Sequence, residues 1–425
     1  MTQARGDGLS VMWTNRRVLI ASLTGTAVEF YDFYIYATAA SLVFGHLFFP
    51  SSSPSAQLLA SYASIGLAFV ARPLGASIFG HFGDRIGRKS TLVASLMLMG
   101  GSTLAIGFLP TYQTIGWVAP LILCLLRFGQ GFGLGGEWGG AALLAVENAP
   151  PGWRARFGMM PQLGAPVGFI AANGLFLILG ALLTEEQFMA WGWRIPFLGS
   201  AVLVGVGLWV RLKLTETPEF AAALEEAPPP SVPLGELFGR HLGATLAATL
   251  GVICCFAIFY LSTTFALGQA TQIMGLKRET VLIVQLCAIL LMAIGIVHAG
   301  WWSDRTSPRR VLIVGCLGTV PMGFVFGPLL ISGSYLQMFF GLALALYLMG
   351  LTYGPLGAWL TDRFPTRVRY TGASVAFNAG GIVGGAGAPI AAQILTEALG
   401  GSAVGYYLSV AAALSLIGLL LSPKD

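Results

Sequence analysis

Five charged residues lie within long apolar stretches of the sequence: Glu29, Asp32, Arg72, Arg127 and Glu137. A charge in the hydrocarbon region of a bilayer costs about 2.5–3.5 kcal/mol even on translocon-insertion scales. Each of the five should therefore face the interior of a helix bundle and have a partner there. Carboxylates and guanidinium groups in such a place can bind protons or the carboxylate of a substrate. All five lie in the N-terminal half of the chain.

Helix geometry predicts how these charges pair. A rise of about 1.5 Å per residue puts Asp32 and Arg127 in the outer half of the membrane. Arg72 and Glu137 fall in the inner half, with Glu29 between. We expect Asp32 to pair with Arg127, and Arg72 to pair with Glu137 or Glu29.

Glu29 and Asp32 are three residues apart and share one helix face. Repulsion between two such carboxylates favours proton binding by one of them. Our hypothesis is that Asp32, in exchange with Arg127, is the principal proton site, with Glu29 or Glu137 as the second. The alternative is a set of fixed ion pairs that hold the spans together.

Composition predicts the elements that must position these charges. Of the 425 residues, 56% are hydrophobic and 10% are charged, against roughly 25% charged in a soluble domain. A soluble fold is excluded on this ground. About twelve apolar runs recur, each near the roughly 20 residues that a helix needs to cross a bilayer. The predicted fold class is an all-α integral membrane protein with twelve transmembrane helices in two pseudo-symmetric six-helix bundles.

The expected organisation has two halves. Residues 214–240 contain five glutamates and three consecutive prolines, so they are too polar to span and are predicted to be a linker. The predicted segments are a cytoplasmic tail (1–17), an N-terminal bundle (18–213), the cytoplasmic linker (214–240), a C-terminal bundle (241–421) and a cytoplasmic C-terminus (422–425). The spans are expected at 18–45, 57–81, 91–109, 118–146, 155–182, 191–213, 241–268, 279–302, 310–332, 335–361, 370–396 and 401–421.

Lys and Arg residues predict the orientation. Of 23 such residues, 18 fall on the side of the membrane that holds both termini and the linker. Arg194, Lys277 and Arg278 fall on the other side. Because cytoplasmic loops carry the excess of positive charge, both termini are expected in the cytoplasm, and the location is expected to be a bacterial inner membrane.

Two pairs of motifs indicate an internal repeat. The segment Gly-Asp-Arg at 83–85 after the second span is echoed by Ser-Asp-Arg at 303–305 after the eighth. The segment RARFG at 154–158 before the fifth span is echoed by RVRYTG at 367–372 before the eleventh. Parallel repeats of six spans are typical of two-bundle transporters.

These motifs resemble those of a known family. The segment GHFGDRIGRK at 80–89 is similar to the loop signature of the major facilitator superfamily, and RFGQGFG at 127–133 is similar to its span-4 motif. Further segments resemble the metabolite:proton symporters within it, whose members carry shikimate, 2-oxoglutarate, citrate and proline or betaine. These segments are EFYDF (29–33), ARPLG (71–75), GGEWGG (135–140), ETPEF (216–220) and FPTR (364–367).

The resemblance implies a secondary active transporter that imports a small polar metabolite, such as a shikimate-like or dicarboxylate compound, by proton symport with alternating access. Proton-coupled uptake of proline or betaine is the alternative, and a proton-driven efflux pump or a passive facilitator is less favoured. An enzyme is not expected. The expected partners are a small-molecule metabolite, protons and the lipid bilayer, without nucleic acid, cofactor or metal, and the chain is expected to be a monomer.

The loop signature is interpreted as a gate between the halves. Asp84 and Asp304 can accept hydrogen bonds from arginines or helix N-termini across the interface. The other expected gating residues are Arg85, Arg88, Arg305 and Arg367. The alternative is that the basic residues of the loop only set topology.

Neutral residues complete the candidate site. Tyr31, Gln130, Gln162 and Asn378 lie within spans and offer hydrogen bonds to a substrate, although each can equally join two helices. The five cysteines lie in apolar runs without metal-ligand spacing, so we expect them to act as small hydrophobic residues.

Overall fold

The structure is a computed structural model. It describes residues 8–51, 53–86, 88–135, 137–147, 149–213, 234–365 and 368–422, and within these ranges the side chains of residues 80–92, 137–139 and some others are not described. Most of the predicted linker, residues 214–233, lies outside the described residues. Its last seven residues form the short helix α13, Leu234–Arg240.

The described residues of the first half form six long helical runs. Most are continuous, because their apolar residues and helix-forming side chains extend over the whole bilayer thickness. The runs are α2 (Arg16–Ala39) with η1 (Ala40–Phe44) and α3 (Gly45–Phe48), α4 (Pro54–Ile86), α5 (Arg88–Phe108), α7 (Val118–Leu134) with α8 (Glu137–Glu147), α9 (Arg154–Leu182), and α11 (Ile195–Lys213).

The described residues of the second half form six more runs. They are α14 (Leu242–Tyr260) with η3 (Leu261–Phe265), α15 (Ala266–Gly268) and η4 (Gln269–Ile273), α16 (Arg278–Ser303), α17 (Pro308–Leu330), α18 (Tyr335–Tyr353) with α19 (Leu356–Thr361), α20 (Arg369–Gly381) with η5 (Ile382–Ala386) and α21 (Gly387–Leu399), and α22 (Val404–Leu421). Short helices connect the runs: α1 (Gly8–Thr14), α6 (Tyr112–Ile115), α10 (Glu185–Ala190), η2 (Gly192–Arg194) and η6 (Gly401–Ala403).

Each predicted span corresponds to one of these runs. Among the described residues, eight helices are long and apolar enough to cross a membrane, and three shorter apolar ones cover 93–108, 118–134 and 192–206. The prediction of one continuous helix over 118–146 is wrong in detail, because α7 ends at Leu134 and α8 begins at Glu137. Glycine is the poorest helix former after proline, and α7 ends before Gly135, which is followed by Gly136, outside the described residues.

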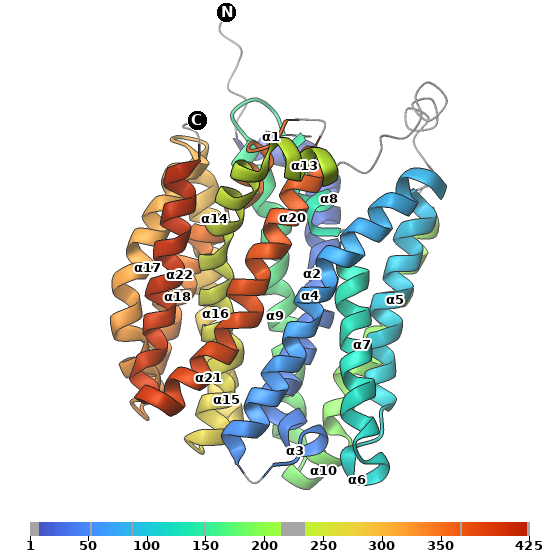
Figure 1. The fold of residues 1–425 in the computed structure, drawn as a ribbon, viewed down its shortest axis with the longest axis vertical. Helices are drawn as coiled ribbons and strands as arrows, with labels where there is room; N and C mark the ends of the chain where they lie inside the picture. Colours follow the sequence, from blue (N-terminus) through green and yellow to red (C-terminus); the bar gives the residue numbers. More distant parts are fainter. Residues whose placement is uncertain are drawn as a thin grey trace, which may run out of the picture.

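The helices pack as two bundles that meet along two seams. At one seam α9 contacts α16, and at the other α4 contacts α20, η5 and α21. A repeat of six spans exchanges the second span with the eighth and the fifth with the eleventh, so it converts one seam into the other. The described chain begins and ends at the same face, at the top of Figure 1, whereas α3, α6 and α10 lie at the opposite face.

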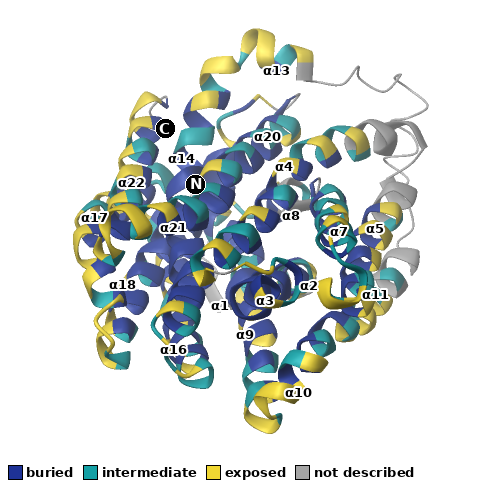
Figure 2. Ribbon diagram, turned by 60° about the horizontal axis from the view of Figure 1, so that its bottom comes forward, coloured by how far each residue is buried: buried dark blue, intermediate teal, exposed yellow. Residues whose placement is uncertain are grey.

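Burial follows this architecture. The buried residues lie on the helix faces that turn toward the interior, and exposed residues cover the outside of peripheral helices such as α17 and α22 (Figure 2). Many exposed side chains are large and apolar, including Phe324, Phe340 and Leu420. A water-facing surface would not favour them, and a lipid-facing surface does.

Glycines permit the closest helix contacts. A side chain at Gly131 would overlap the backbone of Ala68, and one at Gly135 would overlap the backbone of Arg72. In the second half, Gly380 and Gly384 lie against α14 in the same way. Small residues thus bring α7 against α4 and α20 against α14.

Candidate functional site

A chain of polar contacts links the predicted proton site to a buried arginine. Arg127 Nη1 donates to Gln130 Oε1 over 2.9 Å, and Gln130 Nε2 donates to Thr103 Oγ1 over 2.6 Å. The Thr103 hydroxyl donates to the carbonyl of Met99 over 2.9 Å and lies 3.5 Å from Asp32 Oδ2, its more distant acceptor. We call this set of four residues the relay. Its members come from α2, α5 and α7, and all four are buried.

The relay corrects the predicted direct pairing. Asp32 and Arg127 form no ion pair in the described part of the chain, and two neutral side chains stand between them. Asp32 Oδ1 accepts no hydrogen bond from any described residue. The Asp32 carboxylate is thus 1% exposed and has neither a full ion pair nor a complete set of hydrogen bonds. Thr103 was not predicted, because one hydroxyl in an apolar run carries no periodic or compositional signal.

Aromatic rings hold both buried arginines. The Arg127 guanidinium lies 4.0 Å from the ring centroids of Phe33 and Tyr36. The Arg72 guanidinium lies 4.5 Å from Phe33 and 4.9 Å from Phe69. Cation–π contacts of this kind stabilise a desolvated guanidinium. They leave its N–H groups available: Arg72 Nε and the Nε and Nη2 of Arg127 donate no hydrogen bond to any described residue.

The other predicted residues take different places. Glu29 is half-buried on α2, and the Glu137 side chain lies outside the described residues. The Tyr31 hydroxyl donates to the carbonyl of Pro196 over 3.1 Å. Asn378 Nδ2 donates to the Gly135 carbonyl, 3.2 Å across the seam between the halves. Gln162 is fully buried on α9.

A small cavity lies between the halves. Its volume is about 10 Å³, room for about one water molecule. The first half lines it with Tyr34, Thr38 and Asn173, among others, and the second half with Thr263 and Gln285, among others. A metabolite can occupy this place only when the halves part.

At the face that holds both termini, Asp304 joins the halves. Its carboxylate accepts hydrogen bonds from the backbone N–H groups of Ala155 and Arg156, at 2.8 and 3.1 Å, and from Arg156 Nε at 2.7 Å. The Arg156 guanidinium also lies 3.7 Å from the ring of Trp153 and 4.6 Å from that of Trp301. A carboxylate at the first turn of α9 is favoured by the helix dipole.

Further ion pairs join the two halves at this face. Arg154 and Asp362 are 2.6 Å apart, and Arg369 and Glu147 are 3.7 Å apart. Arg305, an expected gating residue, is exposed. The other expected gating side chains lie outside the described residues: Asp84, Arg85, Arg88 and Arg367.

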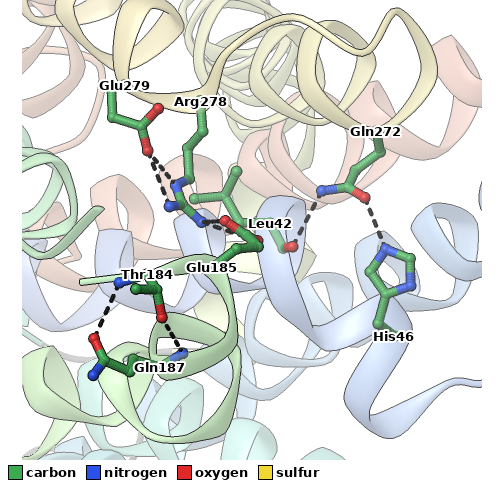
Figure 3. A network of polar contacts seen from close by, with 8 residues as sticks. All are labelled: Leu42, His46, Thr184, Glu185, Gln187, Gln272, Arg278 and Glu279. Carbon is green, nitrogen blue, oxygen red and sulfur yellow. Dashed lines mark hydrogen bonds and ion pairs between the residues drawn. The ribbon is translucent and has the colours of Figure 1, made fainter. Parts of the chain in front are cut away.

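The opposite face is closed by two polar contacts between the halves (Figure 3). Arg278 at the start of α16 pairs with Glu185 of α10 at 3.1 Å and with its neighbour Glu279 at 3.0 Å. Gln272 donates to the carbonyl of Leu42 over 3.1 Å and accepts from His46 Nε2 over 2.9 Å. Contacts thus join the halves at both faces, with the small cavity between them.

These features define a class of protein: a helical membrane protein with two pseudo-symmetric bundles, a polar site between them and contacts that can close either face. A family model agrees. The model of the Major Facilitator Superfamily matches residues 22–389 and 283–425, and the chain belongs to this superfamily.

Curated relatives place the chain among metabolite transporters. The inner membrane metabolite transport protein YhjE of Escherichia coli K12 is 51% identical over 96% of this chain and 94% of its own length. The shikimate transporter of the same organism is 41% identical over 90% of this chain and 88% of its own. A proline/betaine transporter of Salmonella typhimurium is 29% identical over 95% and 82%. The chain is thus a multi-span membrane transporter of metabolites and not an enzyme.

Solved structures share the fold. The partially occluded inward-open form of the xylose transporter XylE from E. coli superposes with a TM-score of 0.74, covers 96% of both chains and is 15% identical. The proton:xylose symporter XylE bound to 6-bromo-6-deoxy-D-glucose gives a TM-score of 0.72 over 97% of this chain and 95% of that chain, also at 15% identity. The predicted twelve-helix major facilitator fold is confirmed.

Proposed function

We propose that the chain imports a small organic acid, such as a shikimate-like or dicarboxylate compound, together with protons by alternating access. The observation that carries this proposal is the relay. A transporter without proton coupling has little need to bury a carboxylate, and Asp32 is buried with one oxygen that no described residue hydrogen-bonds. Its link to Arg127 runs through Gln130 and Thr103, which can rearrange at less cost than a buried ion pair can break.

The proposed cycle uses the two faces in turn. When the contacts of Arg278 and Gln272 break, the face opposite the termini opens and Asp32 receives a proton. Substrate binding then draws the halves together into the occluded state. Release of Asp304 from the first turn of α9 opens the face of the termini, where substrate and proton leave.

The buried arginines favour an anionic substrate. The N–H groups of Arg72 and Arg127 that are not engaged by described residues can bind a carboxylate, which guanidinium groups recognise in bidentate geometry. The 41%-identical shikimate transporter supports the same substrate class. We further propose that both termini lie in the cytoplasm, since the Lys and Arg excess lies on that side. We also propose that the chain acts as a monomer.

A second candidate is proton-coupled uptake of proline or betaine, which the relatives at 29% identity favour. Such a zwitterion would place its cationic end beside a carboxylate or an aromatic face. A proton-driven efflux pump is less supported, because the curated relatives carry the names of metabolite, shikimate and proline or betaine transporters.

The test uses purified protein in liposomes with a weakly buffered medium. Adding shikimate, a dicarboxylate, proline or betaine in separate experiments should make the medium alkaline only with the true substrate, since that substrate carries protons inward. The same compounds are first screened by thermal shift, because a ligand that binds the folded state raises its stability. Uptake without alkalinisation would contradict proton symport, and acidification would indicate exchange.

A further inference from the structure

The side chain of Gln285 on α16 is held in one orientation and leaves one atom without a partner. Its Nε2 donates to the carbonyls of Ser262 and Thr263, at 3.1 and 2.7 Å. The reverse orientation would bring the amide oxygen against two carbonyls, so the bonds fix which atom is which. Gln285 is 1% exposed and lines the cavity between the halves. Its Oε1 accepts no hydrogen bond from any described residue, a costly state for a buried acceptor.

The carbonyls that hold Gln285 belong to the π-helix η3. The next carbonyl, that of Thr264, accepts from Ser41 Oγ over 2.9 Å and from the Tyr62 hydroxyl over 3.4 Å. Ser41 lies in η1, the π-helix at the corresponding place in the first half. Through consecutive carbonyls, η3 therefore contacts Gln285 at the cavity and also Ser41 and Tyr62 of the first half. π-Helices are rare and are frequent at functional sites.

The other residues that line the cavity determine which kind of substrate group can bond to Gln285 Oε1. Thr38 donates to Asn173 Oδ1 over 2.9 Å, and Asn173 Nδ2 donates to the Phe169 carbonyl over 3.3 Å. The lining residues carry no charge, and Tyr34 and Phe169 supply aromatic surface. Gln285 thus brings a buried acceptor without a described partner to a neutral, partly aromatic site, and the complement of that acceptor is an uncharged hydrogen-bond donor.

We propose that Gln285 is a specificity-determining residue that accepts a hydrogen bond from a hydroxyl group of the substrate. This proposal rests on the proposed function and narrows it: the substrate is a hydroxylated organic acid, with its carboxylate at the arginines and a hydroxyl at Gln285. A quaternary ammonium compound has no donor to offer at this position. Because η3 also bonds to the first half, the same contact favours closure of the face opposite the termini.

The test compares ligands as well as proteins. The dissociation constants of shikimate and of analogues with one ring hydroxyl replaced by hydrogen or by a methoxy group are measured by calorimetry on the purified full-length chain. For one hydroxyl, both replacements should weaken binding to the wild type by about tenfold, the effect of leaving a buried acceptor unpaired. In Gln285→Leu the same analogues should differ from shikimate by less than about twofold, as expected when the interaction is already lost.

Gln393→Leu is the matched control. Gln393 is equally buried and also has an Oε1 without a described partner, but it does not line the cavity. This variant should keep the full discrimination between shikimate and its analogues. If no replacement weakens wild-type binding, or if Gln285→Leu still discriminates, the assignment is overturned and the proposed function stands. If the wild type binds betaine and none of the hydroxylated acids, the proposed substrate class and the assignment both fail.

Discussion

The two halves of the molecule share one helical arrangement and differ in where they carry charge. The first half buries Asp32, Arg72 and Arg127 between its helices, and these are the charged residues buried in the described part of the chain. The second half lines the interface with neutral side chains such as Gln285, and brings charge to its ends, as at Asp304. We infer from this difference that the first half binds the proton and the second half recognises uncharged groups of the substrate.

Among the substitutions considered, Asp32→Asn should have the largest effect on transport, because it removes the proposed proton site of the first half. Asparagine keeps the shape of the side chain but cannot carry the proton, so accumulation driven by a pH gradient should fall to passive equilibration. Counterflow exchange of labelled substrate should persist, and both are measured in the same proteoliposomes. Loss of folding in Asp32→Asn would instead assign Asp32 a structural role.

Asp304→Asn tests whether the charge that the second half carries at this end keeps the face of the termini closed. The Asp304 side chain is 5% exposed and accepts three hydrogen bonds from the first half. Hydrogen bonds to charged groups contribute about 1.5–3 kcal/mol, so opening of this face should become about ten- to a hundredfold more frequent. Hydrogen–deuterium exchange at Ala155 and Arg156 reports this opening directly.

Asp362→Asn is the matched control for that experiment. Asp362 and its partner Arg154 have side chains 41% and 44% exposed, and such exposed pairs contribute about 0–1 kcal/mol. Exchange at the first turn of α9 should rise by less than about fivefold. Equal exchange rates in the two variants would refute the gating role of Asp304.

Thr103→Val tests the relay of the first half against an equally buried threonine of the second half. Valine keeps the volume and removes the hydroxyl that joins Gln130 to Asp32, so proton-driven uptake should fall by about tenfold, as for one lost buried hydrogen bond. Thr319→Val is the counterpart in the second half, where Thr319 is equally buried and its hydroxyl donates to the carbonyl of Gly315 in its own helix. Uptake by Thr319→Val should match the wild type. A similar loss in both variants would mean that the relay has no special role.

Glu185→Gln should have the smallest effect. The Glu185 side chain is 71% exposed, and Arg278 keeps its contacts with Glu279 and with the ring of Phe188, 3.8 Å away. We expect a change in transport rate of less than about threefold, consistent with the small contribution of an exposed ion pair. A larger loss would assign this contact a main part in closing the face opposite the termini.

The sequence predicts the spans well, because length and hydrophobicity are local properties. The spacing of small residues in α7 also favours a close helix contact there, but it does not identify α4 as the partner. The break between Leu134 and Glu137 and the π-helices η1 and η3 were not predicted. The residues of η1 and η3 are ordinary helix residues, and tertiary packing decides where the extra residue of a π-helix is accommodated.

The site was predicted in part. Apolar context identifies Asp32, Arg72 and Arg127 as buried charges, and helical rise gives their depth. Neither gives the lateral distance between helices, so the direct pairing of Asp32 with Arg127 was expected where Thr103 and Gln130 intervene. The orphaned oxygen of Gln285 likewise depends on which carbonyls the other helices present.

The most direct test of the central claim is infrared difference spectroscopy of the carboxyl groups during substrate binding. The account predicts a substrate-dependent change in the band of a protonated carboxyl group in the wild type. The change should be lost in Asp32→Asn and kept in Glu29→Gln. A change that persists in Asp32→Asn would contradict the account, because another carboxylate would then carry the proton.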